Sequence, residues 1–217
     1  HKPDVLVVFS NTTVEMKETL EYRDKIVKEW NINFIEAKPE MTFWEVVKKY
    51  GYPAPRMMTK EKERLVKMGK AQSQSIPKCC YILKEKPALK VYRGLGIQCV
   101  FFGLRWDESY NRKWTIIRRG TLFYHKGHKH WKCYPIAYWD TADVWRYIEE
   151  NDIPVNKAYE ISDRIGCITC TAYEGWEERM AKLYPKLYQR IMHEFSRTTL
   201  DAVSYTHLRA HETSLHL

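Results

Sequence analysis

The stretch Asp4-Val-Leu-Val-Val-Phe9 has the character of a buried parallel strand, because a short β-branched run is followed directly by polar residues. Apolar side chains then recur at helical spacing over residues 15–30, and a second short apolar run over residues 32–37 ends at Lys38-Pro39. A strand, a helix and a second strand in this order are typical of a parallel sheet covered by helices.

The same alternation continues through the middle of the chain. Residues 42–50 are predicted to form a short helix that ends before Gly51, and residues 59–70 are predicted to form a charged surface helix. Residues 98–103 are predicted as a third strand, with the adjacent cysteines Cys79-Cys80 in the segment before it.

The second half of the chain adds one extended region and two helices. Residues 114–136 are predicted to be extended. Asp140 is a suitable N-cap for a helix that runs to about Glu150, and residues 173–195 are predicted to be helical with a break at Pro185. The predicted fold class is therefore α/β, with an open parallel sheet flanked by helices.

The size and charge of the chain limit its class and its partners. At 217 residues it is long enough for one domain, and its net charge of +9 suits nucleotides, nucleic acid or simply a solvated basic surface. No apolar run approaches the roughly 20 residues that cross a bilayer. No basic-then-apolar leader opens the sequence. We therefore expect a cytoplasmic protein without a membrane partner.

The six cysteines are expected to be reduced thiols or metal ligands, because the sequence carries no export signal. Cys79-Cys80 and Cys167-Ile-Thr-Cys170 are two pairs that could give four thiolates to one metal site, with unrelated core thiols as the alternative. Neighbouring side chains diverge, so the adjacent pair suits a larger inorganic core better than a single ion. Two further cysteines are predicted to be small buried hydrophobic side chains: Cys99 and Cys133.

Several short motifs occur in the order found in one enzyme family. Cys79-Cys80-Tyr-Ile-Leu-Lys84-Glu-Lys-Pro87 resembles the CC-xxx-K-xx-P signature of assimilatory adenylyl-sulfate reductases. Arg164-Ile-Gly-Cys167-Ile-Thr-Cys170 resembles their IGCxxC element, and Gly103-Leu-Arg105-Trp-Asp-Glu-Ser109-Tyr-Asn-Arg112 resembles their GxRxxxSxxR segment. The likeness covers about residues 4–195. The wider group is the phosphoadenylyl-sulfate (PAPS) reductase family of adenine-nucleotide α-hydrolase-like enzymes, which includes the adenylyl-sulfate (APS) reductases.

The resemblance implies a metal cofactor. The four cysteines that match the family's ligands would bind a [4Fe-4S] cluster, with zinc as the alternative: Cys79, Cys80, Cys167 and Cys170. Lys84 matches a lysine that lies between cluster and substrate, where a cation stabilises both anions.

The resemblance also implies four substrate-binding residues. Arg105 and Arg112 match arginines that face the phosphate and sulfate of the substrate, which suits the planar fork of a guanidinium group. Asn11 and Thr12 follow the first strand, where the family has its D-T-G element near the adenosine. The sequence departs from this element, with Asn11 in place of Asp, and the pair could instead cap the next helix.

The activity that the resemblance implies is reduction of adenylyl sulfate or 3'-phosphoadenylyl sulfate to sulfite through a cysteine thiosulfonate. The partners would be the nucleotide, thioredoxin or a similar thiol donor, and a second copy of the chain if the protein is a homo-oligomer. ATP-dependent sulfur transfer to nucleic acid is the alternative function, which the basic charge also fits. A zinc-stabilised binding module without catalysis is a third.

The resemblance further predicts missing parts. Residues 1–202 are expected to be an incomplete domain that lacks the first strand and the S-G-G-x-D phosphate loop. No catalytic residue is assigned, because the E-C-G-x-H tail that carries the family's nucleophilic cysteine is not found. From Val203 the sequence resembles a translated transposon adapter, so residues 203–217 are expected to be a non-native tail. We expect this chain to be inactive by itself.

A histidine-rich stretch lies outside these motifs. Three histidines are predicted to lie at a hairpin tip: His125, His128 and His130. A solvated loop is favoured there over a metal site.

Overall fold

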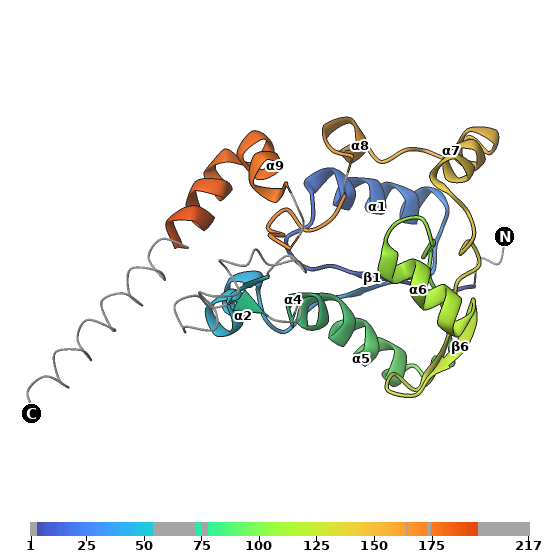
Figure 1. Cartoon of the computed structure of the whole chain (residues 1–217). Coiled ribbons are helices and arrows are strands. Elements are labelled where there is room, and N and C mark those ends of the chain that lie inside the picture. The colour runs from blue at the N-terminus through green and yellow to red at the C-terminus, as the bar shows by residue number, and fades with distance from the viewer. Residues whose placement is uncertain (1–3, 54–72, 75–77, 164, 173–174, 195–217) are drawn as a thin grey trace, which may run out of the picture. The chain divides into compact units, whose positions relative to one another are not determined.

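The computed structural model describes residues 4–53, 73–74, 78–163, 165–172 and 175–194 (Figure 1). The chain divides into two compact units, one made of His1–Pro87 with Ala158–Leu217 and the other of Ala88–Lys157. The predicted helix over residues 59–70 and the predicted tail over residues 203–217 lie outside the described residues. No helix in the described part of the chain combines the length and apolar character needed to cross a membrane.

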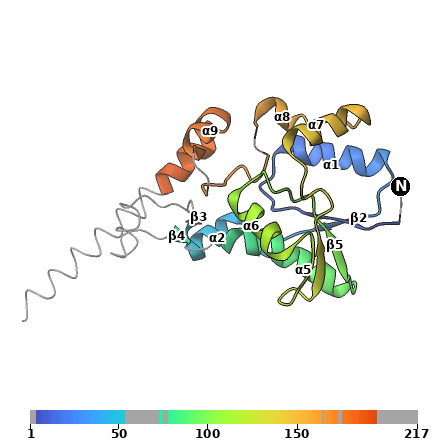
Figure 2. The same ribbon diagram turned by 45° about the vertical axis from the view of Figure 1, so that its right-hand side comes forward.

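The first unit begins with the strand–helix–strand arrangement that the sequence predicted. Strand β1 (Val7–Ser10) pairs in parallel with β2 (Phe34–Ala37), and helix α1 (Lys17–Glu29) connects them (Figures 1 and 2). Met16, at the N-cap of α1, and Ile26 are the buried apolar side chains of this connection. The α/β class with parallel pairing is therefore confirmed.

Helix α2 (Phe43–Tyr50) has clear local start and stop signals. The Thr42 side chain accepts a hydrogen bond from the Glu45 backbone N–H, and the Glu45 carboxylate accepts one from the Thr42 backbone N–H, which completes a capping box. Gly51 ends the helix as predicted, and its φ of 80° is a conformation that glycine adopts at low cost. Strand β3 (Tyr52–Pro53) follows and pairs in parallel with β4 (Ser73–Gln74).

The adjacent cysteines lie on a helix that the sequence patterns did not single out. Helix α4 (Lys78–Cys80) continues into a π-helical turn, η1 (Tyr81–Glu85), and then into α5 (Lys86–Gly94). A widened π turn inside a helix is a local irregularity that is frequent at functional sites.

Helices occupy much of the last described part of the first unit, over residues 158–194. Helix α8 (Ala158–Ile161) and α9 (Trp176–Leu183) are followed by a helix over residues 185–194. The interruption at Tyr184 confirms the predicted break at Pro185, because proline is accepted in the first turn of a new helix.

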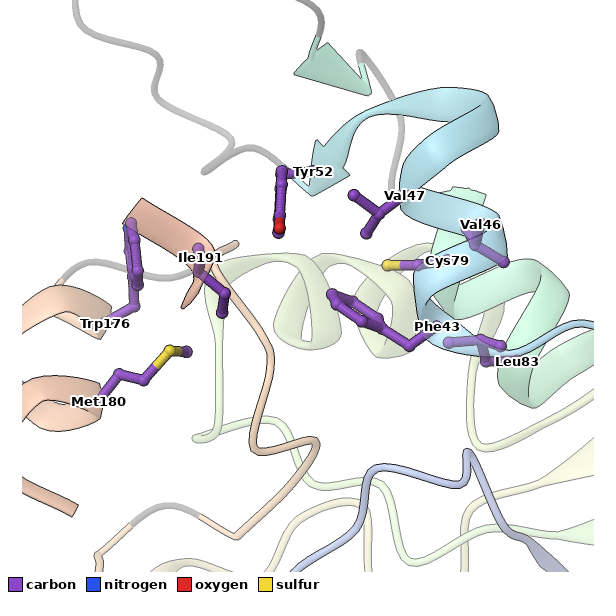
Figure 3. Close-up of a cluster of buried hydrophobic side chains, with 9 residues drawn as sticks. All are labelled: Phe43, Val46, Val47, Tyr52, Cys79, Leu83, Trp176, Met180 and Ile191. Carbon is purple, nitrogen blue, oxygen red and sulfur yellow. The ribbon is translucent and has the colours of Figure 1, made fainter. Parts of the chain in front are cut away.

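The core of the first unit joins segments that are far apart in the sequence. Figure 3 shows its nine buried side chains, which come from α2, β3, the cysteine helix and the C-terminal helices. They are Phe43, Val46, Val47, Tyr52, Cys79, Leu83, Trp176, Met180 and Ile191. The hydroxyl of Tyr52 also donates a hydrogen bond of 2.6 Å to Glu194, so apolar packing and a polar contact both hold the helix over residues 185–194 against β3.

The second unit contains a three-stranded sheet. Its strands are β5 (Cys99–Phe101), β6 (Leu122–His125) and β7 (His130–Cys133), in the order β5-β7-β6. β5 and β7 are parallel, whereas β6 and β7 form an antiparallel hairpin. Helix α7 (Thr141–Glu150) starts at Asp140 as predicted, because Asp140 and Asp143 form a capping box.

One prediction for the second unit was wrong. Residues 114–136 were expected to be extended, but α6 (Tyr110–Arg119) occupies their beginning. The run Thr115-Ile-Ile117 is β-branched and favours a strand locally. The side chain of Ser109 accepts a hydrogen bond from the Arg112 backbone N–H and caps the helix, and Ile116 packs against Tyr134 in a small core.

Candidate functional site

Three segments of the first unit converge beside the carboxyl end of β1. The Ser10 hydroxyl, on the last residue of β1, donates a hydrogen bond of 3.2 Å to the Lys84 carbonyl on η1. The backbone N–H of Ile168 donates one of 2.8 Å to the Val14 carbonyl, and this attaches the loop over residues 165–172 to the segment that follows β1. The carboxyl ends of parallel strands are where open α/β sheets bind ligands.

The two predicted cysteine pairs interact within this region. The pKa of Cys79 is raised above its usual range, first by its hydrogen bond to Cys80 and then by burial. Charge on the thiols of the second pair, Cys167 and Cys170, raises it further. Because such effects weaken quickly with distance, the structure brings the four predicted thiols into one neighbourhood.

The four thiols are not equivalent. The hydrogen bond from Cys79 lowers the pKa of Cys80, and the positive charge of Lys84 adds to that effect. Burial raises the pKa of Cys167, and Lys84 partly offsets the rise. Of the two adjacent thiols, Cys79 therefore keeps its proton more readily and Cys80 loses its proton more readily. The Cys80 thiolate that results can bind a metal.

Lys84 is the cation within this group. Burial alone would lower its pKa, but negative charge on Cys167, Glu15 and Cys80 raises the pKa above its ordinary value. Lys84 therefore stays protonated, and it offsets part of the negative charge that thiolates concentrate in a small volume.

The loop that carries the second pair is tightly folded. The Cys170 backbone N–H donates to the Cys167 carbonyl at 3.2 Å, and the Thr171 hydroxyl donates to the Pro53 carbonyl at 2.6 Å. Between the two cysteines, Thr169 is 1% exposed, and its hydroxyl has no hydrogen-bond partner among the described residues. A buried hydroxyl beside two thiols can donate to the sulfur atoms of a bound inorganic group.

Among the residues that the structure describes, no three His, Cys, Asp or Glu side chains lie where they could hold a single metal ion. Cys79 also belongs to the apolar core, where Figure 3 shows it near Phe43 and Val47. The donor set is nevertheless composed only of thiols, which is the chemistry of iron–sulfur clusters and of thiolate zinc sites.

Asn11 and Thr12 lie at the predicted end of β1, and both are buried. The Asn11 side chain donates to Glu36 at 2.7 Å and accepts from the Thr13 backbone N–H at 2.8 Å. Thr12 Oγ1 donates to Glu15 at 2.7 Å and lies 3.4 Å from Cys167 Sγ. The alternative role as an N-cap of the next helix is wrong, because α1 begins after Met16.

Arg105 and Arg112 form a group of their own in the second unit. Both contact the carboxylate of Glu108, and Asp107 lies 3.5 Å from Arg105 Nε. The Arg105 side chain is 13% exposed, and its Nη1 is buried without a hydrogen-bond partner in the described part of the chain. A buried guanidinium N–H that has no acceptor is suited to an oxyanion.

The sequence patterns did not identify two residues of the site, Glu15 and Thr169. Glu15 interacts with Thr12, Lys84 and Cys167, but the sequence pattern indicated only that a helix begins there. Thr169 was visible only as the second spacer of the CxxC motif. The signal that could have identified Glu15 is its position three residues after Thr12, which is a side-chain hydrogen-bond spacing.

The prediction for the remaining cysteines was wrong. Cys99 is exposed and Cys133 is half-buried, so neither is a buried core side chain. The register pairs Cys99 with Trp131 and Phe101 with Cys133, which places both thiols on one face of the sheet. That face is exposed in the described structure, because Phe101 and Trp131 are also exposed.

The histidines of the hairpin are less exposed than those of a solvated loop. The rings of His125 and His128 lie 3.9 Å apart, and the His125 Nδ1 accepts a hydrogen bond from the His128 backbone N–H. His130 is 2% exposed and packs edge-on against Tyr92. The three histidines therefore pack close together, and their environment lowers the pKa of His128 and of His130, chiefly through burial.

The histidines of the hairpin are expected to make the fold less stable in acid. Burial lowers the pKa of His128 from 6.5 to about 4, and positive charge on Lys132, His125, His130 and Arg93 contributes. The unfolded chain binds the proton first, so the free energy of unfolding should decrease as the pH falls from 6.5 toward about 4. His128→Gln should flatten this dependence in thermal unfolding followed by circular dichroism. Equal slopes for parent and variant would contradict the assignment.

Comparisons with known proteins agree with the motifs and the fold. The sequence profile described as the phosphoadenosine phosphosulfate reductase domain matches residues 1–173. An uncharacterized protein of Methanocaldococcus jannaschii is 33% identical over 192 residues, which are 86% of this chain and 35% of that protein. The adenosine 5'-phosphosulfate reductase of Staphylococcus haemolyticus is 32% identical over 175 residues, which are 79% of this chain and 62% of that enzyme.

The fold has a counterpart among solved structures. The phosphate complex of phosphoadenylyl-sulfate reductase from Candida auris matches with a TM-score of 0.52 and 22% identity, over 77% of this chain and 70% of that one. The chain spans about a third to two-thirds of the curated relatives described above. Because the family profile covers most of its length, the chain belongs to the phosphoadenosine phosphosulfate reductase domain family.

Proposed function

We propose that this chain is the cluster-bearing and nucleotide-binding part of an enzyme that reduces adenylyl sulfate or 3'-phosphoadenylyl sulfate to sulfite. The observation that carries the proposal is the place of Lys84, whose carbonyl accepts a hydrogen bond from Ser10 at the carboxyl end of β1 and whose pKa is raised by negative charge on Cys167, Cys80 and Cys170. A cation in this place can hold a negatively charged inorganic group and a negatively charged substrate together.

In this proposal a [4Fe-4S] cluster is held by the two thiol pairs, Cys79 with Cys80 and Cys167 with Cys170. Four thiolates from two separate segments are the usual ligand set of such a cluster. The side chains of adjacent cysteines diverge, so this pair suits a larger inorganic core better than a single zinc ion. When bound, the cluster supplies negative charge and a rigid connection between the two segments.

The protein's own residues then have separate tasks. Lys84 offsets the charge of the thiolates, and Arg105 and Arg112 bind the phosphate and sulfate oxygens of the nucleotide. In the proposed reaction, a cysteine thiolate attacks the sulfate sulfur, the bond between that sulfur and the AMP oxygen breaks, and a thiosulfonate forms. Thioredoxin or a similar thiol donor then releases sulfite as a disulfide forms.

The proposal can be tested by nucleotide binding. We expect the chain to bind adenylyl sulfate in isothermal titration calorimetry, and Arg105→Met to weaken binding by roughly 10- to 100-fold, because a hydrogen bond to a charged group is lost. Arg146→Met is the matched control, since Arg146 is an exposed arginine of the same unit that pairs with Asp143 on α7. If the two variants bind adenylyl sulfate with equal affinity, Arg105 does not contribute to nucleotide binding.

A further inference from the structure

The second unit contains a strongly basic segment outside the thiol site. Residues 110–133 contain seven Lys and Arg residues and neither Asp nor Glu. They are Arg112, Lys113, Arg118, Arg119, Lys126, Lys129 and Lys132. The segment comprises α6 and the β6–β7 hairpin, so its charge is concentrated on two neighbouring elements of one unit.

Exposed aromatic rings alternate with these cations along α6. Tyr110 and Trp114 are one helical turn apart, 71% and 38% exposed, and their ring centres lie 5.7 Å apart. The guanidinium of Arg118, one turn further on, lies 5.2 Å from the centre of the Trp114 ring. One face of the helix therefore presents two aromatic rings followed by a cation.

A second aromatic pair adjoins this face. Trp106 and Tyr138 have ring centres 6.2 Å apart, and Tyr138 is 66% exposed. Lys113, on α6, places its ammonium group 5.2 Å from the centre of the Trp106 ring. Lys113 therefore links α6 to a second aromatic pair through a cation–π contact.

An open groove lies at the other end of α6. Its volume is about 440 Å³, and its lining includes Arg119 and Lys126 together with Phe123, Tyr124 and His125. The guanidinium of Arg119 lies 5.2 Å from the centre of the Phe123 ring. The groove combines aromatic surfaces with cations, as the helix face does, and it has the size of a small-ligand pocket.

We propose that α6 and the β6–β7 hairpin form a binding surface for single-stranded nucleic acid. Unpaired bases stack on exposed aromatic rings, and the phosphates between them contact lysine and arginine. An acidic protein or an anionic membrane would use the cations but has no need of stacked rings. The surface lies within the second unit and shares Arg112 with the proposed nucleotide site, but the side chains changed in its test, Tyr110, Lys113 and Arg118, have no part in the reductase proposal.

The test is fluorescence anisotropy with labelled oligonucleotides of about 16 nucleotides, as single strands and as a duplex. We expect the full chain to prefer single strands, because only their bases are free to stack. Tyr110→Ala, which removes a ring that is 71% exposed, should weaken binding by roughly tenfold with little change in salt dependence.

A second variant addresses the charges. Lys113→Gln with Arg118→Gln should reduce the slope of log affinity against log salt by about 1.4, which corresponds to two lost phosphate contacts. Lys25→Gln with Lys28→Gln removes the same charge from exposed positions on α1 of the first unit and should have no such effect.

Three results would overturn the proposal: equal affinity for duplex and single strand, unchanged affinity of Tyr110→Ala, or equal loss in the α1 control. Circular dichroism of each variant confirms that it is folded. Loss of adenylyl-sulfate binding would not affect this outcome, so the two proposals fail separately.

Discussion

Cys79→Ser and Cys167→Ser are each expected to abolish stable iron binding after anaerobic incubation of the chain with ferrous iron and sulfide. The parent should take up about four iron ions per chain, because the four thiols that share one neighbourhood suit a [4Fe-4S] cluster. A serine hydroxyl is not ionised at neutral pH and is a poor iron ligand, so either change removes one of the four thiolate ligands. Iron and acid-labile sulfide per chain, together with visible absorption, measure the loss.

Cys99→Ser is the matched control for these variants. Cys99 is exposed on β5 of the second unit, and its substitution makes the same chemical change outside the site. It should retain the iron content of the parent. Iron retained by Cys167→Ser, or a colourless parent that binds one zinc ion per chain, would contradict the cluster proposal.

The β1–α1–β2 part of the fold could be predicted because its signals are local. Each strand is a short apolar run, and the helix between them has its own periodicity. The sequence patterns did not predict α6, because Thr115-Ile-Ile117 favours a strand. In the folded chain, the cap at Ser109 and the packing of Ile116 stabilise a helix instead. Tertiary contacts often override a local preference of this size.

The site could be predicted only in part for a related reason. The motifs identified the two thiol pairs, but nothing in their spacing indicates that a loop near residue 168 is bonded to Val14. That bond places Cys167 near Thr12 and Lys84, and it also explains why Glu15 belongs to the site. Contacts between segments more than a hundred residues apart depend on the folded chain, so single-sequence patterns do not contain them.

Lys84→Gln is expected to weaken adenylyl-sulfate binding by at least about 30-fold while the chain still takes up iron. The glutamine side chain is one atom shorter and remains polar, but it lacks the positive charge that Cys167, Glu15 and Cys80 stabilise. Truncating one partner of a buried charge pair formed on binding commonly costs about 2–5 kcal/mol, and in our proposal the anionic nucleotide loses the cation that it faces. Calorimetric titration on the iron-loaded chain gives the affinity, and iron analysis of the same sample gives the cofactor content.

Lys86→Gln separates this effect from a general loss of charge. Lys86 lies two residues further along the same helix, but it is exposed and pairs with Glu40 at 3.1 Å. An exposed pair of this kind contributes little, so this variant should bind adenylyl sulfate like the parent. If both lysine variants lose the same affinity for adenylyl sulfate, binding depends on overall charge, and Lys84 has no specific role in it. If Lys84→Gln loses its iron instead, the lysine supports the thiol site rather than the nucleotide.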